Sequence, residues 1–177
     1  SAASDVYKRQ VMGPDNVREE TLRRMMTQYK NDLMRMCVAY LKDAALAEDA
    51  VQETFVKAYK ALDTFRGDSS EKTWLIRIAI NTCRSIQRDR WFRFVDRSVA
   101  ADTLPIQSAS DEDRALMEAV MSLPHKYKEV VLLYYYQGLN LMEISEALGV
   151  AASTISTRLK KAREKLRREL EGGQAHV

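Results

Sequence analysis

The chain has few of the residues that break helices or form sharp turns. Of its 177 residues, only six are glycine and three are proline. An all-β sandwich or barrel needs many more turn-forming residues, so this composition argues against both. Apolar residues make up 46% and charged residues 30%, which is typical of a globular protein. We therefore expect an all-α fold whose core is large enough to need no covalent cross-links.

Cysteine and histidine are also scarce. Cys37 and Cys83 lie far apart within helical patterns, which predicts buried thiols in a reducing compartment rather than a disulfide or metal ligands. The two histidines are His125 and His176, and no acid, base and nucleophile stand at a meaningful spacing. We therefore expect no enzymatic activity, no metal, no cofactor and no small-molecule substrate.

Long apolar runs are missing as well. The longest, Val130–Tyr136, is far shorter than the roughly 20 residues that cross a bilayer. The first residues lack the charged and then apolar pattern of a signal peptide. These features predict a cytoplasmic protein, in which the abundant Met and Tyr residues, Tyr134 to Tyr136 included, belong to the core.

Apolar residues recur at helical spacing in two parts of the chain. The helices expected span residues 22–40, 48–62, 71–93, 114–122, 124–137, 141–148 and 153–171. Residues 1–16 show no such period. The predicted architecture is therefore two small helical domains, 17–99 and 113–171, with a flexible linker over 100–112 that contains Pro105.

The net charge is only +3, but the charges are unevenly distributed. Residues 43–72 hold seven acids against four bases, and residues 84–97 hold five bases against two acids. Residues 111–149 hold seven acids against three bases, and residues 153–171 hold seven bases against three acids. Each acidic block thus precedes a basic one, which favours two modules that each present a face to DNA phosphates. Ordinary solvated surface is the alternative.

The segment Asn140–Lys161 has the pattern of a helix-turn-helix. Ser145 is small enough for close helix contact, and Gly149 suits the left-handed turn between the helices. In the second helix, apolar residues share one face, and short hydroxyls and cations share the other, as a helix that reads the major groove requires. The residues predicted to contact duplex DNA are Ser153, Thr154, Ser156, Thr157, Arg158, Lys160, Lys161 and Arg163. A basic helix that only packs is the alternative.

A second polar row lies on the helix expected over 71–93. Arg77, Asn81, Arg84 and Arg88 follow one another at spacings of four, three and four residues, on the side of Trp74. Such a row can hold phosphates, while an aromatic ring stacks on an exposed base. The alternative is that Trp74 is part of the core and that the arginines are only solvated.

The helix expected over 48–62 carries a third surface. Its outward residues, Asp49, Gln52, Glu53, Val56 and Lys60, form an acidic row that includes one valine. This row is unsuited to DNA but suits a protein partner that carries Arg or Lys. Solvated surface is again the alternative.

Three stretches together resemble a known family. They are DAVQETFVKAYKAL (49–62), FRGDSSEKTWLIRIAINTCRSIQR (65–88) and LPHKYKEVVLLYYYQGLNLMEISEALGVAASTISTRLKKAREKL (123–166). In this order and spacing they resemble the sigma factors of bacterial RNA polymerase, in particular the small extracytoplasmic-function group. Three residues depart from the family pattern: Ala151 stands where a Ser or Thr helix cap is common, Ser85 where an acid is frequent, and Ser156 where a base is frequent.

The resemblance implies a promoter-specificity subunit that binds core RNA polymerase. It implies that Asp49, Gln52, Glu53 and Val56 dock on the coiled coil of the β′ clamp. The C-terminal helix would read minus-thirty-five DNA while its domain sits on the β flap. The residues implied to recognise and open the minus-ten element are Arg66, Lys72, Trp74, Arg77, Asn81, Arg84 and Arg88.

The resemblance also implies regulation by an anti-sigma factor, which can hold such a protein at the inner face of the membrane. One alternative function remains open at this point. A free-standing helix-turn-helix regulator would act without polymerase, would bind a palindromic duplex tightly on its own, and would have no use for the acidic row at residues 49–53.

Overall fold

The computed structural model of the chain describes residues 13–93 and 110–174. Most of the aperiodic lead expected over 1–16 and of the linker expected over 100–112 therefore lies outside the described residues. Every regular element within the described ranges is helical, and none is a strand. The prediction of an all-α fold is confirmed. No helix in these ranges is long and apolar enough to cross a membrane.

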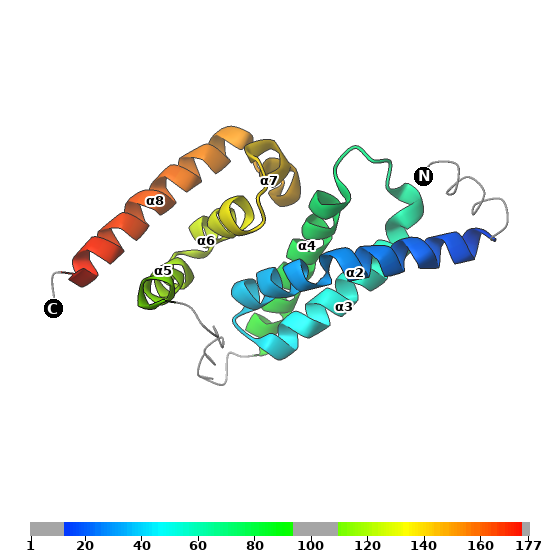
Figure 1. Cartoon of the computed structure of the whole chain (residues 1–177), viewed down its shortest axis with the longest axis horizontal. Helices are drawn as coiled ribbons and strands as arrows, with labels where there is room; N and C mark the ends of the chain where they lie inside the picture. Colours follow the sequence, from blue (N-terminus) through cyan, green and yellow to red (C-terminus); the bar gives the residue numbers. More distant parts are fainter. Residues whose placement is uncertain (1–12, 94–109, 175–177) are drawn as a thin grey trace.

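Three helices form the N-terminal bundle: α2 (Pro14–Leu41), α3 (Ala44–Ala61) and α4 (Glu71–Arg93), with a short 3-10 turn, η1 (Leu62–Thr64), after α3 (Figure 1). The helix expected from residue 22 begins earlier, at Pro14, because proline is accommodated in the first helical turn. The break before α3 occurs where expected. Lys42 adopts a left-handed conformation with φ 56°, and the Asp43 side chain accepts a hydrogen bond from the Leu46 N–H at 3.0 Å.

The C-terminal group contains α5 (Asp111–Ser122), α6 (His125–Val131), a π-helical turn η2 (Leu132–Tyr136), α7 (Leu141–Leu148) and α8 (Ala152–Gln174). The helix expected from residue 114 begins at Asp111, because Ser110 and Asp113 form a capping box. The single helix expected over 124–137 is instead α6 followed by η2. Gly149 ends α7 with φ 66°, which fits the turn of a helix-turn-helix.

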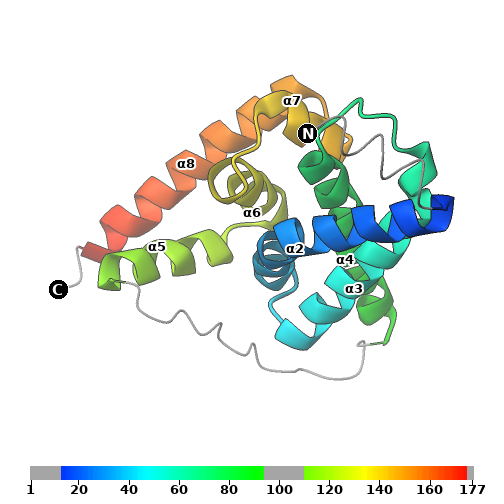
Figure 2. The same ribbon diagram turned by 45° about the vertical axis from the view of Figure 1, so that its right-hand side comes forward.

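One hydrophobic core spans both groups of helices. Leu75, Ile76 and Ile80 of α4 belong to the same buried cluster as Ile144 and Ala147 of α7. Both views of the ribbon show α7 beside α4, and Figure 2 shows α6 next to α2 (Figures 1 and 2). The C-terminal group therefore packs directly against the N-terminal bundle.

The two cysteines lie in this core. Cys37 of α2 and Cys83 of α4 are fully buried, and both are free thiols. Their burial confirms the prediction of buried thiols. Their sulfur atoms lie 3.6 Å apart, a proximity that their spacing in the sequence did not indicate.

Candidate nucleic-acid and polymerase interfaces

Helix α4 has one buried face and one polar face. The buried face includes Leu75, Ile76, Ala79, Ile80 and Cys83. On the polar face, Arg77, Asn81 and Arg88 are exposed, and Arg84 is half-buried. The packing of α4 against α2, α3 and α7 thus leaves the predicted row on one side of the helix.

Trp74 lies partly in the core and partly at the surface. It packs on Phe65, with ring centroids 4.7 Å apart, and both rings are half-buried. Arg66 is exposed in the loop that joins Phe65 to α4. Gly67 gives this loop a left-handed turn with φ 75°. The aromatic pair can therefore support a stacked base at the start of the polar face.

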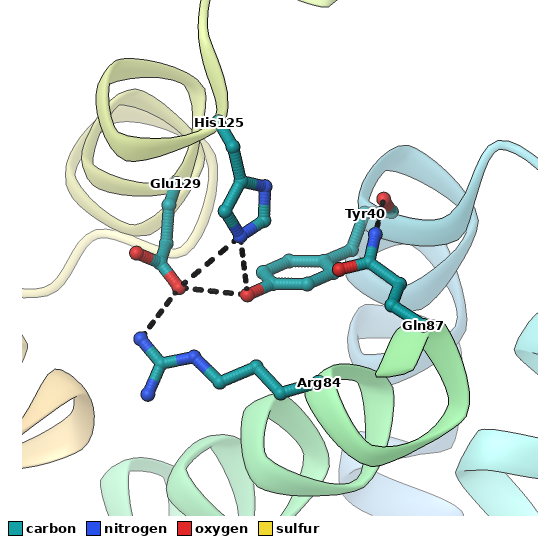
Figure 3. Close-up of polar contacts among 5 residues, drawn as sticks. All are labelled: Tyr40, Arg84, Gln87, His125 and Glu129. Atoms are coloured by element: carbon teal, nitrogen blue, oxygen red, sulfur yellow. Dashed lines mark hydrogen bonds and ion pairs between the residues drawn. The ribbon is translucent and has the colours of Figure 1, made fainter. Parts of the chain in front are cut away.

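Arg84 does not point freely into solvent. Its Nη2 lies 2.9 Å from Oε1 of Glu129 on α6, and the same oxygen accepts a 2.8 Å hydrogen bond from the Tyr40 hydroxyl on α2. Nε2 of His125 lies 2.8 Å from the Tyr40 hydroxyl and 4.0 Å from Oε1 of Glu129 (Figure 3). Gln87 donates to the backbone carbonyl of Tyr40 at 3.2 Å. We call Tyr40, Arg84, His125 and Glu129 the interdomain cluster.

The interdomain cluster perturbs its titratable groups. Burial raises the pKa of Tyr40, and the negative charge of Glu129 raises it further. Burial lowers the pKa of His125 below its usual value; the charge of Glu129 opposes this shift, whereas those of Lys128 and Arg84 reinforce it. The cluster therefore favours a neutral tyrosine and a neutral histidine around the carboxylate of Glu129.

Lys72 also contacts the C-terminal group. Its Nζ donates to the Gln137 carbonyl oxygen at 2.8 Å and lies 3.8 Å from Asp32 Oδ2 on α2. Gln137 in turn donates from its side chain to the Asp32 carbonyl oxygen at 3.2 Å. Thr73 Oγ1 lies 3.5 Å from Glu143 Oε1 on α7. The sequence predicts a free cationic surface for Lys72 and Arg84. It does not predict these partners, because residues so far apart in the chain form no local pattern.

Helix α3 presents the acidic row to solvent. Val51 and Phe55 are buried against α2 and α4. The acidic row, Asp49, Gln52, Glu53, Val56 and Lys60, is exposed throughout. Glu53 forms an ion pair with Lys57 at 2.7 Å, and Val56 is 53% exposed.

Helix α8 has one apolar face and one polar face, as the sequence predicts. Ile155, Leu159 and Ala162 are buried against α6 and α7. On the opposite side, the predicted reading residues Ser153, Thr154, Ser156, Thr157, Lys160 and Lys161 are exposed, and Arg158 is half-buried. The Thr157 hydroxyl donates to the Ser153 carbonyl at 3.0 Å.

Arg163 is held by the tyrosines of η2. Its Nε donates to the Tyr135 hydroxyl at 2.7 Å, and its guanidinium lies 6.0 Å from the centre of the Tyr134 ring. Tyr135 and Tyr136 are exposed, so the expectation that the tyrosine run belongs to the core is wrong for these two residues. The π-helical turn changes the register of the run and turns both rings outward.

Comparison with known proteins shows which family the chain belongs to. The family model described as Sigma-70 region 2 matches residues 25–93, and the model described as Sigma-70, region 4 matches residues 113–166. Over 158 residues the chain is 33% identical to the ECF RNA polymerase sigma factor SigW of Bacillus subtilis, across 80% of this chain and 84% of SigW. The chain belongs to the sigma-70 family. Because SigW is named as an ECF sigma factor, this match indicates that the chain belongs to the extracytoplasmic-function group.

The chain is also similar to other sigma factors. RNA polymerase sigma-H factor of Pseudomonas aeruginosa is 29% identical over 163 residues, across 83% of this chain and 84% of that protein. The sigma factor RpoE of Bartonella quintana, solved in complex with the anti-sigma factor NepR, has a similar fold, with a TM-score of 0.75 and 24% identity. That match covers 86% of this chain and 98% of RpoE.

The family matches divide between the two groups of helices. The region 2 match covers α4 and α3 entirely and most of α2. The region 4 match covers most of α5, all of α6 and α7, and α8 as far as residue 166. The exposed polar faces of α4 and α8 therefore belong to different sigma regions. Membership of the family disfavours the free-standing regulator.

Proposed function

We propose that the chain is a promoter-specificity subunit that binds core RNA polymerase and directs transcription initiation. The observation that carries this proposal is the exposure of two separate polar faces in a member of the sigma family. Arg77, Asn81 and Arg88 face solvent on α4, and the hydroxyl and lysine side chains of the reading helix face solvent on α8.

The two faces suit different forms of DNA. Helix α8 offers short hydroxyls at its start and lysines one turn later, which suits the edges and phosphates of a duplex major groove, here the minus-thirty-five element. Helix α4 offers guanidinium groups next to the Phe65 and Trp74 rings, which suits a separated minus-ten strand with an unstacked base. Both steps are binding events, so we propose that the chain carries out no chemical reaction of its own.

The acidic row of α3 supports the proposal for polymerase docking. Val56 supplies an exposed apolar centre, and Asp49, Gln52 and Glu53 surround it with hydrogen-bond acceptors. A basic and partly apolar partner surface, such as the β′ clamp coiled coil, complements this row. The C-terminal group would then rest on the β flap. The chain would work in the cytoplasm with the polymerase, and an anti-sigma factor would be its regulator.

The experiment combines polymerase binding with promoter opening. We expect the chain to co-elute with core polymerase and to direct transcription from promoters selected from a random library. Asp49→Ala with Val56→Ala should weaken co-elution about tenfold or more, because both a charge and an apolar contact are lost. Glu48→Ala, which removes an exposed acid beside the row, is the matched control and should bind as the wild-type chain does.

The same holoenzymes test the role of α4. Arg77→Ala and Asn81→Ala should reduce permanganate reactivity of the minus-ten region more than they reduce binding of the promoter duplex. Arg35→Ala, which removes an exposed arginine from α2, serves as the control. Co-elution that is insensitive to the acidic row, together with tight binding of duplex DNA without polymerase, would instead favour a free-standing regulator.

A further inference from the structure

Two arginines of helix α2 hold the two ends of the loop that leads into α4. Arg18 Nη2 donates to the Tyr59 carbonyl oxygen in the last turn of α3 at 3.0 Å, and its Nη1 lies 3.0 Å from Asp63 Oδ2 in η1. Arg24 donates to both carboxylate oxygens of Glu71, the first residue of α4, at 2.9 and 2.6 Å. We call Arg18 and Arg24 the loop-holding arginines. Both precede residue 25, where the Sigma-70 region 2 match begins.

The loop between these two ends has few contacts of its own. Among the residues that the structure describes, none forms a hydrogen bond or an ion pair with residues 66–69. The residues on either side are fixed. The Phe65 N–H donates to the Leu62 carbonyl oxygen at 3.2 Å, and Ser70 Oγ accepts from the Thr73 N–H at 3.1 Å. The path of residues 66–69 therefore depends on where the two ends of the loop are held.

The spacing of the loop-holding arginines lets one helix reach both ends of the loop. Arg24 lies six positions after Arg18, which corresponds to about 9 Å along the helix axis and to about 120° between the directions of the two side chains. Arg18 therefore extends toward α3 and η1, and Arg24 extends toward α4. Both views of the ribbon place α2 alongside α3 and α4 (Figures 1 and 2). The two arginines thus fix the end of α3 and the start of α4 relative to α2.

The contacts of the two arginines restrain position more than they add stability. Arg24 and Glu71 form a bidentate guanidinium–carboxylate pair, which fixes orientation as well as distance. The guanidinium carbon of Arg18 also lies 4.9 Å from the centre of the Tyr59 ring. The Arg24 side chain is 51% exposed, and exposed ion pairs add little to the free energy of unfolding. Loss of this pair should therefore leave the fold intact and should change mainly the position of the loop.

We propose that Arg18 and Arg24 are positioning residues for recognition of the separated minus-ten strand. They hold both ends of the loop, and so keep Arg66 and the Phe65 ring where an unstacked base and its phosphate can bind. The two arginines act through the loop and are not ligands of the strand. A loop that is already held in its binding conformation loses less conformational entropy when the strand binds, which increases affinity. The inference rests on the proposed function, because it takes the loop and the aromatic pair as ligands of that strand.

Glu71→Ala in the holoenzyme tests the proposal by the sign of its effect. Removal of an acid near bound DNA should by itself strengthen the binding of any strand, because it removes electrostatic repulsion. Loss of the Arg24 contact should instead weaken the binding of a strand that the loop reads. The probe is a fluorescein-labelled single strand with the non-template minus-ten sequence of a promoter selected with the wild-type holoenzyme. We expect Glu71→Ala to bind this strand about fivefold more weakly by fluorescence anisotropy, and stronger binding would overturn the proposal.

A second strand, in which the minus-ten bases are permuted, separates positioning from general damage to the fold. The quantity to compare is the ratio of the affinities for the selected and the permuted strand, which we call the strand preference. A smaller folded fraction lowers both apparent affinities equally and leaves the strand preference unchanged. We expect Glu71→Ala to lower the strand preference about fivefold. A strand preference equal to that of the wild-type holoenzyme would overturn the proposal.

Two exposed residues of α2 supply matched controls. Glu19→Ala removes an acid as Glu71→Ala does, and Arg23→Ala removes the arginine next to Arg24. We expect Arg24→Ala to lower the strand preference as far as Glu71→Ala does, and both controls to change it less than twofold. An equal decrease in Arg23→Ala and Arg24→Ala would overturn the proposal, because the positive charge of α2, and not the contact with Glu71, would then explain the effect.

A charge exchange distinguishes positioning from direct contact with the strand. Arg24→Glu alone should lower the strand preference, because two carboxylates then face each other. Adding Glu71→Arg restores the ion pair in reverse and keeps the net charge of the chain, so the strand preference should return to within about twofold of the wild-type value. A double variant as poor as Arg24→Glu would overturn the proposal, because Arg24 would then act on the strand itself.

Arg18→Met tests the other end of the loop. Methionine keeps an alkyl chain over the Tyr59 ring but cannot donate to the Tyr59 carbonyl or to Asp63. We expect the strand preference to fall about threefold, while Arg35→Ala, which removes an exposed arginine further along α2, should leave it unchanged. A wild-type strand preference in Arg18→Met would overturn the proposal for this end of the loop.

The wild-type holoenzyme separates this inference from the proposed function. If it opens the selected promoters while Glu71→Ala and Arg24→Ala keep the wild-type strand preference, only the role of the loop-holding arginines fails. The same holds if it opens promoters without preferring the selected strand. If the wild-type chain neither binds core polymerase nor opens any promoter, the proposed function fails and the positioning role fails with it.

Discussion

Lys128 and Glu129 are neighbours on α6 that are both buried but have opposite surroundings. Glu129 accepts hydrogen bonds from Arg84 and Tyr40. Lys128 has a pKa lowered to about 8, because burial removes its ammonium group from water and because Lys42 adds a second positive charge. At neutral pH the folded chain therefore holds a charged lysine in a place that disfavours the charge.

Replacing Lys128 with methionine should stabilise the chain. The unfolded chain has a lysine pKa near 10.5, so between pH 8 and about 10.5 it binds more protons than the folded chain, and the free energy of unfolding rises with pH. Lys128→Met should abolish this rise and should increase the free energy of unfolding by about 1 to 3 kcal/mol at pH 7. Urea denaturation of the wild-type chain and of Lys128→Met at pH 7 and pH 9.5 measures both effects.

Lys126→Met is the control for this prediction. Lys126 lies on the same helix but is exposed, so its replacement should change the free energy of unfolding by less than about 0.5 kcal/mol. A Lys128→Met chain that is no more stable than Lys126→Met would show that burial of the ammonium group costs little.

At the scale of single elements, α8 begins without a side-chain cap. The Thr154 and Ile155 N–H groups donate to the Ala151 carbonyl, but the alanine side chain offers no acceptor. By contrast, α5 and α7 begin with complete capping boxes at Ser110 and Asn140. The helix predicted to read DNA is thus held mainly by its buried face.

Ala151→Ser should stabilise α8. A serine hydroxyl at this position can accept a hydrogen bond from an N–H of the first turn, which is worth about 1 kcal/mol. The melting temperature measured by circular dichroism should rise, and duplex binding should stay unchanged because no charge is added. Ala152→Ser, one residue further into the helix, should bring no such gain. Equal effects at both positions would contradict a capping role.

The helices and their faces could be predicted well from the sequence. Val51 and Phe55 of α3, and Ile155 and Leu159 of α8, are buried as their spacing indicates. The π-helical turn of η2 could not be predicted, because seven consecutive apolar residues show no period that separates one face from another. The sequence therefore predicts a core position for Tyr135, whereas this residue is exposed and accepts a hydrogen bond from Arg163.

At the scale of the whole molecule, the packing of the C-terminal group on the N-terminal bundle places a histidine among polar and charged groups of three helices. His125 faces Tyr40 from α2, Arg84 from α4, and Lys128 and Glu129 from α6. Its lowered pKa means that the neutral ring is favoured while the two groups of helices are packed together. The contribution of His125 to this packing is therefore present above about pH 6.5 and decreases as the pH falls below that value.

The two groups of helices should separate more readily in mild acid. We expect the radius of gyration to be larger at pH 5.5 than at pH 7.5, because protonation of His125 is easier once the ring is solvated. In His125→Gln, which cannot take up this proton, the radius of gyration should depend less on pH. A pH dependence of equal size in both chains would assign the effect to other groups.

The sequence by itself determined the all-α class, the division of polar and apolar faces on α3, α4 and α8, and the resemblance to sigma factors. The helix faces depend on residues three or four positions apart, whose relation is set by the geometry of one helix, and the resemblance depends on the order of stretches along the chain. Only the tertiary structure decided the partners of Arg84 and Lys72 and the proximity of Cys37 to Cys83. Those contacts join residues 45, 65 and 46 positions apart, and they depend on how whole helices dock, which no local pattern encodes.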